Sequence, residues 1–177
     1  MRHLIFDTET TALISNSLLA DRFQPQIIEF FGHIIDENAQ VVEELEFFCN
    51  PGQPLPKEVT QITGIKDEQV RNEKPFSHYA GQVELLIRSA DTVVAHNLSY
   101  DMAVVDGEFK RLKQAVGWPV NRICTVEQTE HLKGHRLNLN ALHEELFGER
   151  FTGAHRARTD VDALTRCYVE LIKRGEI

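Results

Sequence analysis

The sequence contains few cysteines, and their spacing does not suit a metal site. Its 177 residues include only three, Cys49, Cys124 and Cys167, which lie far apart and form no CxxC pair. A structural zinc site and a disulfide framework are therefore both disfavoured. We expect reduced thiols, as in a cytoplasmic protein.

Long apolar runs are also missing from the sequence. No segment approaches the roughly 20 apolar residues of a membrane-spanning helix. Asp7 and Glu9 interrupt the apolar residues near the N-terminus, so no signal peptide is predicted. With 42% hydrophobic residues, a chain of 177 residues is long enough for a buried core. We therefore expect one domain, residues 1–177, in the cytoplasm and without a membrane partner.

A basic excess is the third missing feature. The chain has 19 lysines and arginines against 27 aspartates and glutamates, a formal net charge of −8. A general nucleic-acid coat protein would be basic, so this class is disfavoured. Acidic clusters that hold divalent cations are compatible with a negative net charge. They add negative formal charge to the chain, and the bound cations make the site locally positive. The composition therefore still allows an enzyme that acts on nucleic acid.

The hydrophobic pattern predicts an α/β fold with a mixed sheet. A hairpin followed by alternating helices and strands is typical of this class. Apolar runs with strand character lie at 2–7, 26–35, 40–48, 91–97 and 121–125. Apolar residues at helical spacing, or short helical segments, lie at 57–63, 76–90, 99–112, 138–147 and 157–174. Ser99 is the expected N-cap of the third helix, and Glu108 is expected on its solvent face.

The segment LIFDTET, residues 4–10, runs an apolar strand into two acids. Side chains of a strand alternate, so Asp7 and Glu9 point to one face and Thr8 to the other. Two carboxylates this close disfavour each other's ionisation unless a cation lies between them. Mg²⁺ and Mn²⁺ prefer oxygen ligands and would resolve the conflict. Taken alone, a strand that simply ends in water explains a DxE pattern equally well.

Two later segments supply further polar side chains. In AHNLSYD, Asn97 ends a short strand and Asp101 follows in the first turns of a helix. In GAHRARTD, His155 lies in a glycine-containing loop and Asp160 on the next helix. Individually, a helix-dipole acid and a solvated loop histidine are the simpler explanations.

Considered together, the three segments provide four carboxylates and one histidine. This set suits phosphodiester hydrolysis with two metal ions about 3.5–4 Å apart. A histidine titrates near neutral pH and can serve as the general base.

In order and spacing, FDTET, HNLSYD and HRARTD resemble the three motifs of the DnaQ-like 3′–5′ exonucleases, the DEDDh group. The resemblance spans nearly the whole chain and includes LPKEVTQITGIKDEQV, residues 55–70. It implies an RNase H-like α/β fold with a mixed central sheet flanked by helices. It also implies a 3′–5′ exonuclease that uses two Mg²⁺ or Mn²⁺ ions and releases nucleoside 5′-monophosphates.

The resemblance implies a role for each matching acid and for the histidine. Asp7, Glu9 and Asp160 would hold the first metal ion. Asp7 would bridge to the second ion, which Asp101 would support. His155 would be the general base.

The same resemblance implies substrate contacts. The strand backbone around Thr8 and Thr10, together with Leu13, would bind the terminal nucleotide, and Asn97 belongs to the same substrate-binding set. Ala12 stands where the family commonly has glycine, which is a visible departure from the pattern.

Several functions remain open at this point. DNA 3′ ends, single-stranded or frayed, are favoured as substrate, because FDTETTAL resembles proofreading-type members more than the oligoribonuclease pattern DLEMTGL. An RNA-directed exonuclease is the alternative. A non-catalytic scaffold for a polymerase or repair partner is a second class, although a scaffold would not need all five polar residues. A hydrolase of free nucleotides is a third.

Overall fold

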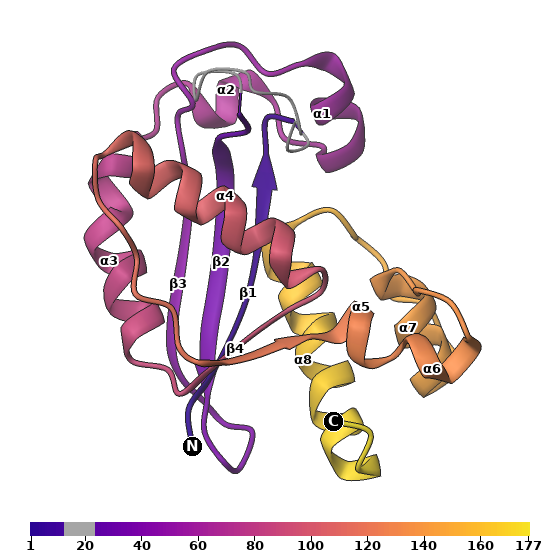
Figure 1. Cartoon of the computed structure of the whole chain (residues 1–177). Coiled ribbons are helices and arrows are strands. Elements are labelled where there is room, and N and C mark those ends of the chain that lie inside the picture. The colour runs from indigo at the N-terminus through magenta and orange to yellow at the C-terminus, as the bar shows by residue number, and fades with distance from the viewer. Residues whose placement is uncertain (13–23) are drawn as a thin grey trace.

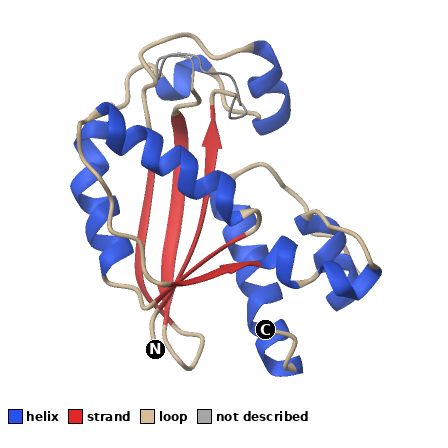
Figure 2. Ribbon diagram, in the orientation of Figure 1, coloured by secondary structure: helices blue, strands red, loops and turns tan. Residues whose placement is uncertain are grey.

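A computed structural model describes residues 1–12 and 24–177, and in these residues the chain forms a five-stranded mixed sheet flanked by helices (Figure 2). The strands lie in the order β3-β2-β1-β4-β5. The first three pair antiparallel, and β1–β4 and β4–β5 pair parallel. Their bounds are β1 (His3–Thr10), β2 (Ile27–Ile35), β3 (Val41–Phe48), β4 (Thr92–Ala95) and β5 (Asn121–Cys124).

The sequence of β2, IIEFFGHII, agrees with its position inside the sheet, between β3 and β1. All of its residues are buried, as expected for a strand with neighbours on both sides and helices on both faces. β3 forms one edge of the sheet, and its residues are mostly exposed and partly acidic, which discourages pairing with another chain.

Helices α3 (Phe76–Arg88) and α4 (Leu98–Arg111) cover one face of the sheet (Figure 1). Their apolar residues pack with alternate residues of β1 and β2 in the largest core cluster. Gly32 permits the close approach of α3, because a Cβ at this position would lie 3.0 Å from the Phe6 Cβ and 3.3 Å from a Leu86 methyl.

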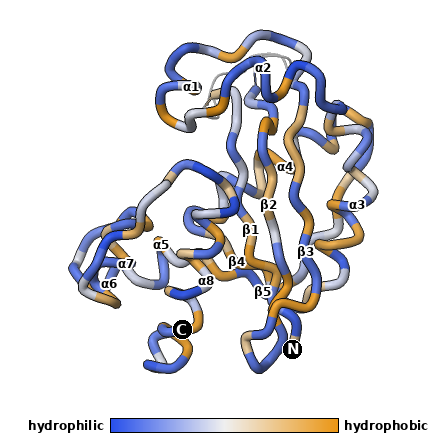
Figure 3. Tube along the Cα trace, turned by 180° about the vertical axis from the view of Figure 1, so that it is seen from behind, coloured by the Kyte–Doolittle hydropathy of each residue, from blue (hydrophilic) through white to orange (hydrophobic). Residues whose placement is uncertain are grey.

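The opposite face is covered by α8 (Ala157–Arg174), as the views from both sides show (Figures 1 and 3). Val161, Leu164 and Tyr168 pack on Ile5 and Phe31 of the sheet. Helix α7 (Leu139–Phe147) lies against the outer side of α8, and short helices α5 (Thr125–Gln128) and α6 (Glu130–Lys133) precede it. Hydrophobic residues concentrate along the strands and on the helix turns that face them (Figure 3).

Helices α1 (Lys57–Thr63) and α2 (Asp67–Val70) lie beyond the carboxyl end of β1 (Figure 1). Gly64 ends α1 in the left-handed conformation (φ +72°) that favours glycine. The two helices are tied to the sheet through a small core of Ile28, Leu55, Ile65 and Val70.

The predicted helices and strands are confirmed with shifted boundaries, and two details were wrong. Helix α4 begins at Leu98 with Asn97 as N-cap (φ +80°), so Ser99 is not the cap. Asparagine tolerates the left-handed conformation that this strand-to-helix turn requires. Glu108 is not on the solvent face but buried, where it accepts the Ile27 N–H at 2.9 Å and pairs with Arg111 at 3.0 Å.

Other differences have a simple physical origin. β1 extends through Thr10, so the acids of LIFDTET belong to the strand itself. Helices α2, α5 and α6 are one turn long, too short to produce a hydrophobic period. Among residues 1–12 and 24–177, none of the helices has the length and hydropathy needed to cross a membrane.

Candidate active site

Carboxylates gather at the carboxyl end of β1. Asp7 and Glu9 come from β1, and Asp160 comes from the first turn of α8. One carboxylate oxygen of each lies within 4.8 Å of the others. The face of β1 that packs Ile5 against α8 continues through Asp7 and Glu9, because alternate residues of a strand point the same way. Packing of α8 on this face therefore brings Asp160 to the strand end.

Asp101 reaches the same strand end from α4, on the opposite face of the sheet. Its Oδ1 accepts the Thr8 backbone N–H at 3.2 Å and the Thr8 hydroxyl at 2.8 Å. β4 pairs with β1 from His3 to Ile5, so α4, which follows β4, supplies an acceptor where this pairing ends. Asp101 is buried beside the three clustered acids, and its charge raises the pKa of Asp7.

The four carboxylates are held close to one another against their mutual repulsion. Burial, followed by the charges of Asp101 and Glu9, raises the pKa of Asp7 well above its ordinary range. Burial and the charges of Asp160 and Glu29 raise the pKa of Glu9 to about 8. Burial raises the pKa of Asp101 to about 7 and that of Asp160 to about 6, although hydrogen bonds oppose both shifts.

This arrangement fits a hard divalent cation. The donor set consists of carboxylate oxygens, which Mg²⁺ and Mn²⁺ prefer. A cation within the 4.8 Å group would favour the ionised carboxylates and offset the repulsion between them.

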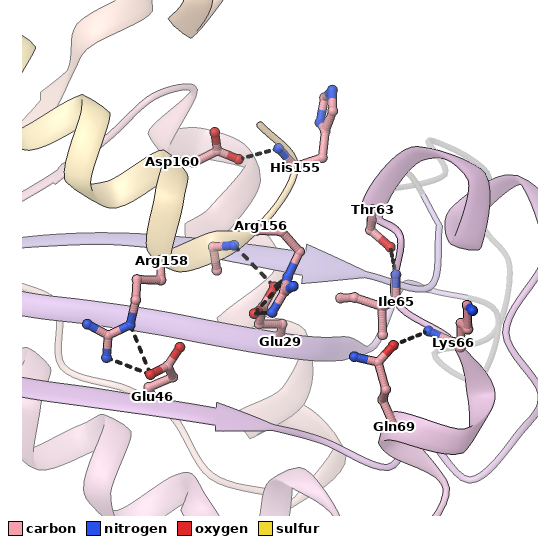
Figure 4. Close-up of polar contacts among 11 residues, drawn as sticks. Glu29, Glu46, Thr63, Ile65, Lys66, Gln69, His155, Arg156, Arg158 and Asp160 are labelled. Carbon is pink, nitrogen blue, oxygen red and sulfur yellow. Dashed lines mark hydrogen bonds and ion pairs between the residues drawn. The ribbon is translucent and has the colours of Figure 1, made fainter. Parts of the chain in front are cut away.

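His155 lies in the loop before α8, in a left-handed backbone conformation (φ +67°). Its backbone N–H donates to Asp160 Oδ2 at 2.8 Å. The imidazole is exposed and points away from Asp160 (Figure 4). The backbone contact fixes the loop on Asp160, and the side chain stands between two cavities beside the carboxylates.

The larger cavity, a cleft of about 630 Å³, runs from the end of β1 to α1. Thr8, Thr10 and Asn97, the predicted substrate-binding residues, line it together with Glu9 and His155. Leu13, the fourth predicted contact, lies outside the described residues. The α1 side of the cleft is partly apolar and includes Val59 and Ile62, which the sequence analysis did not single out.

A second cavity of about 400 Å³ lies on the other side of His155. Asp7 and Asp160 contribute to its wall, so both cavities open on the carboxylate cluster. Polar side chains also line it, namely Asn138 and Asn140 at the start of α7 and Arg150 beyond its end.

Three further residues at the site were missed by the sequence analysis. The Tyr100 hydroxyl lies 2.6 Å from Thr10 Oγ1 and donates to the Ala12 carbonyl at 2.9 Å, which fixes Ala12 beside the end of β1. Glu29 and Arg156 form an ion pair behind the carboxylates at 2.8 Å. The sequence contains one signal for Glu29, a single charged residue within the apolar run QIIEFFGHII.

Comparison with known proteins agrees with this geometry. Residues 4–168 match the model of the exonuclease family RNase_T. The chain is 29% identical to "DNA polymerase III PolC-type" of Listeria innocua over 97% of this chain and 11% of that protein. It is 30% identical to "3′-5′ exonuclease DinG" of Bacillus subtilis over 98% of this chain and 18% of that protein. The chain thus spans less than a fifth of the length of these relatives.

The fold is also similar to that of a solved exonuclease. The nuclease domain of 3′hExo, described as a DEDDh family member bound to rAMP, superposes with a TM-score of 0.77 at 15% identity, covering 98% of this chain and 92% of that one. The predicted RNase H-like exonuclease fold is therefore confirmed. The match to the family model over residues 4–168 shows that the chain belongs to the RNase_T family of exonucleases.

Proposed function

We propose that residues 1–177 form a single exonuclease domain that removes nucleotides from the 3′ end of DNA. The observation that carries this proposal is the convergence of Asp7, Glu9 and Asp160, with Asp101 beside them, at the edge of a cleft. The cleft is large enough for a nucleotide and leads directly to the carboxylates.

The acids would hold two divalent cations, Mg²⁺ or Mn²⁺. Asp7, Glu9 and Asp160 would hold the first ion, and Asp7 would be shared with a second ion that Asp101 supports. When bound, the ions would lower the pKa of the attacking water and stabilise charge on the scissile phosphate. The backbone of Thr8 and Thr10, with Leu13 and Asn97, would hold the terminal nucleotide.

His155 would accept the proton of the attacking water. The water oxygen forms a bond to phosphorus while the bond from phosphorus to the 3′ oxygen breaks. The shortened strand keeps that oxygen as a 3′-hydroxyl after gaining a proton, and the released nucleotide carries the phosphate on its 5′ oxygen. The exposed position of the imidazole between the two cavities supports this role, because both substrate and solvent can reach it there.

Names of relatives support DNA over RNA as the substrate. The relative from Listeria is a DNA polymerase, which also suggests a polymerase or repair partner for this chain. The rAMP bound to 3′hExo supports RNA as the second candidate substrate.

The direct test is degradation of matched single-stranded DNA and RNA oligonucleotides labelled at the 5′ end. With Mg²⁺ or Mn²⁺ we expect a ladder that shortens from the 3′ end, faster on DNA, and no cleavage in EDTA. A faster reaction on RNA would reverse the substrate assignment. Cleavage of nucleoside triphosphates alone would indicate a nucleotide hydrolase, and no cleavage of any substrate by folded protein would indicate a scaffold.

His155→Ala is expected to lower kcat by about 10²- to 10⁴-fold, the range of general base catalysis. Mn²⁺ affinity and oligonucleotide affinity should stay within about twofold, because His155 donates to Asp160 with its backbone N–H, which the substitution keeps. Single-turnover rates and a Mn²⁺ titration measure these quantities. His135→Ala, at an exposed loop position, is the matched control. Full turnover of His155→Ala across the pH range would contradict the base assignment.

A further inference from the structure

Two arginines tie the first turn of α8 to the sheet (Figure 4). Arg156 pairs with Glu29 of β2, and Arg158 pairs with Glu44 and Glu46 of β3. The Arg158 pairs are exposed, whereas the Glu29 side chain is only 1% exposed. The glutamate partners therefore differ in surroundings, although the two arginines are equally exposed and lie two residues apart at the start of α8.

The Glu29 carboxylate is fully engaged. Arg156 Nε lies 3.2 and 3.1 Å from the two carboxylate oxygens, and Arg156 Nη2 lies 2.8 Å from Oε1. The Ala157 backbone N–H donates to Oε2 at 3.1 Å. Glu29 thus accepts both the guanidinium fork and an N–H from the start of α8, a bidentate geometry that fixes direction as well as distance.

The residues that Glu29 holds adjoin the candidate catalytic ones. Arg156 follows His155 directly, and its carbonyl accepts the Asp160 N–H at 3.0 Å. Asp160 in turn accepts the His155 N–H at 2.8 Å. A continuous series of contacts therefore runs from Glu29 through Arg156 to the base and to one metal ligand.

We propose that Glu29 and Arg156 are positioning residues that hold His155 and Asp160 against the acids of β1. This inference rests on the proposed function and extends it to a pair of residues that would touch neither substrate nor metal. We call the Glu29–Arg156 contact, with the Ala157 N–H, the clamp.

Stability alone is a poor explanation for the clamp. An ion pair with a buried member contributes little compared with well-packed apolar residues of the same volume, because the Glu29 carboxylate, 1% exposed, loses its hydration while Arg156 stays 41% exposed. Glu29 also lies directly opposite Glu9 in the β1–β2 pairing, where like charges disfavour each other. The carboxylate of Glu29 therefore has a better explanation in the orientation that it gives to the start of α8 than in the stability that the ion pair adds to the fold.

Arg156→Lys is the decisive variant. It keeps both charges but loses the bidentate fork, so the charge around the carboxylates is unchanged while the clamp loosens. We expect kcat on a DNA oligonucleotide to fall about 10- to 100-fold, as for outer partners of metal ligands. KM should stay within about twofold. Mn²⁺ affinity, titrated without substrate, should weaken several-fold.

Arg158→Lys is the matched control. It makes the same substitution on the same helix, at an arginine that also binds glutamates of the neighbouring strand. A loss of helix anchoring in general would affect both variants alike. The clamp predicts that kcat and Mn²⁺ affinity of Arg158→Lys stay within about twofold of wild type.

A second variant keeps the test decisive if Arg156→Lys does not fold. The double substitution Glu29→Gln with Arg156→Met removes both charges together, so no buried charge is left unpaired and the net charge is conserved. The glutamine oxygen can still accept the Ala157 N–H. The clamp predicts a lower kcat and weaker Mn²⁺ binding here too.

The proposal is overturned if Arg156→Lys and the double variant match Arg158→Lys in both kcat and Mn²⁺ affinity. It is also overturned if only the melting temperature falls. Failure of the proposed function gives a different result, because wild-type protein would then degrade no oligonucleotide. The Mn²⁺ titration would still report in that case whether the clamp positions Asp160.

Discussion

Asp7→Asn is expected to reduce oligonucleotide degradation by at least about 10³-fold, the upper range for loss of one preorganised electrostatic group. Asp7 is repelled by the other three carboxylates of the site, because the charges of Asp101, Glu9 and Asp160 all raise its pKa. An amide at this position removes the proposed shared ligand but preserves the shape of the side chain. Turnover with saturating Mg²⁺ or Mn²⁺, and a Mn²⁺ titration, measure the effect.

The same variant should fold at least as stably as metal-free wild type. Neutralising one member of a crowded carboxylate group relieves repulsion, so a loss of turnover would not come from unfolding. Asp162→Asn is the control, since Asp162 is exposed and lies two residues from Asp160 on the same helix. Retention of more than a tenth of wild-type turnover by Asp7→Asn would refute its assignment as a metal ligand.

The sequence predicts that Asp7 and Glu9 lie close together, because a regular strand fixes the direction of each side chain. Strand alternation alone places Asp7 and Glu9 together, and the structure brings Asp160 to them. Asp101 needed more information. Its binding to Thr8 depends on where β4 stops pairing with β1, which is a property of the sheet and not of either motif.

Local sequence patterns do not predict the environment of a residue whose partner lies far away in the chain. Glu108 has helical neighbours typical of a solvent face, yet it is buried because the N–H of Ile27 needs an acceptor there. Glu29 was treated only as part of a strand, and its contact with Arg156 joins residues 127 positions apart. For Glu29, a charged residue within an apolar run was the one available signal. For both residues, the partner became known only from the fold.

Metal-free protein is expected to lose stability as the pH rises from about 5 to 8.5. The pKa of Glu9 is raised from 4.5 to about 8 and that of Asp160 from 3.8 to about 6, so the folded chain binds more protons than the unfolded chain across this range. The contribution of these protonated carboxyl groups to the stability of the folded chain is complete below their ordinary pKa values. It is lost as the pH rises through the raised pKa values.

The loss should amount to a few kcal/mol, since a pKa difference of one corresponds to about 1.4 kcal/mol. For a chain of this size that is a decrease in Tm of about 5–10 °C. Thermal unfolding in EDTA between pH 5.5 and 8.5 measures it. Asp162→Asn should keep the decrease, and Asp7→Asn should reduce it, because the largest source of repulsion is then neutral.

Divalent cations should oppose this pH dependence. Binding requires ionised carboxylates, so a cation competes with protons at the raised pKa values and binds more tightly as the pH rises. At a concentration 100 times the Kd, bound metal stabilises the folded state by about 2.7 kcal/mol. The difference in Tm between Mn²⁺ and EDTA should therefore widen from pH 5.5 to 8.5. An equal difference at both pH values, or the same widening in Asp7→Asn, would mean that the acids of β1 are not the cation site.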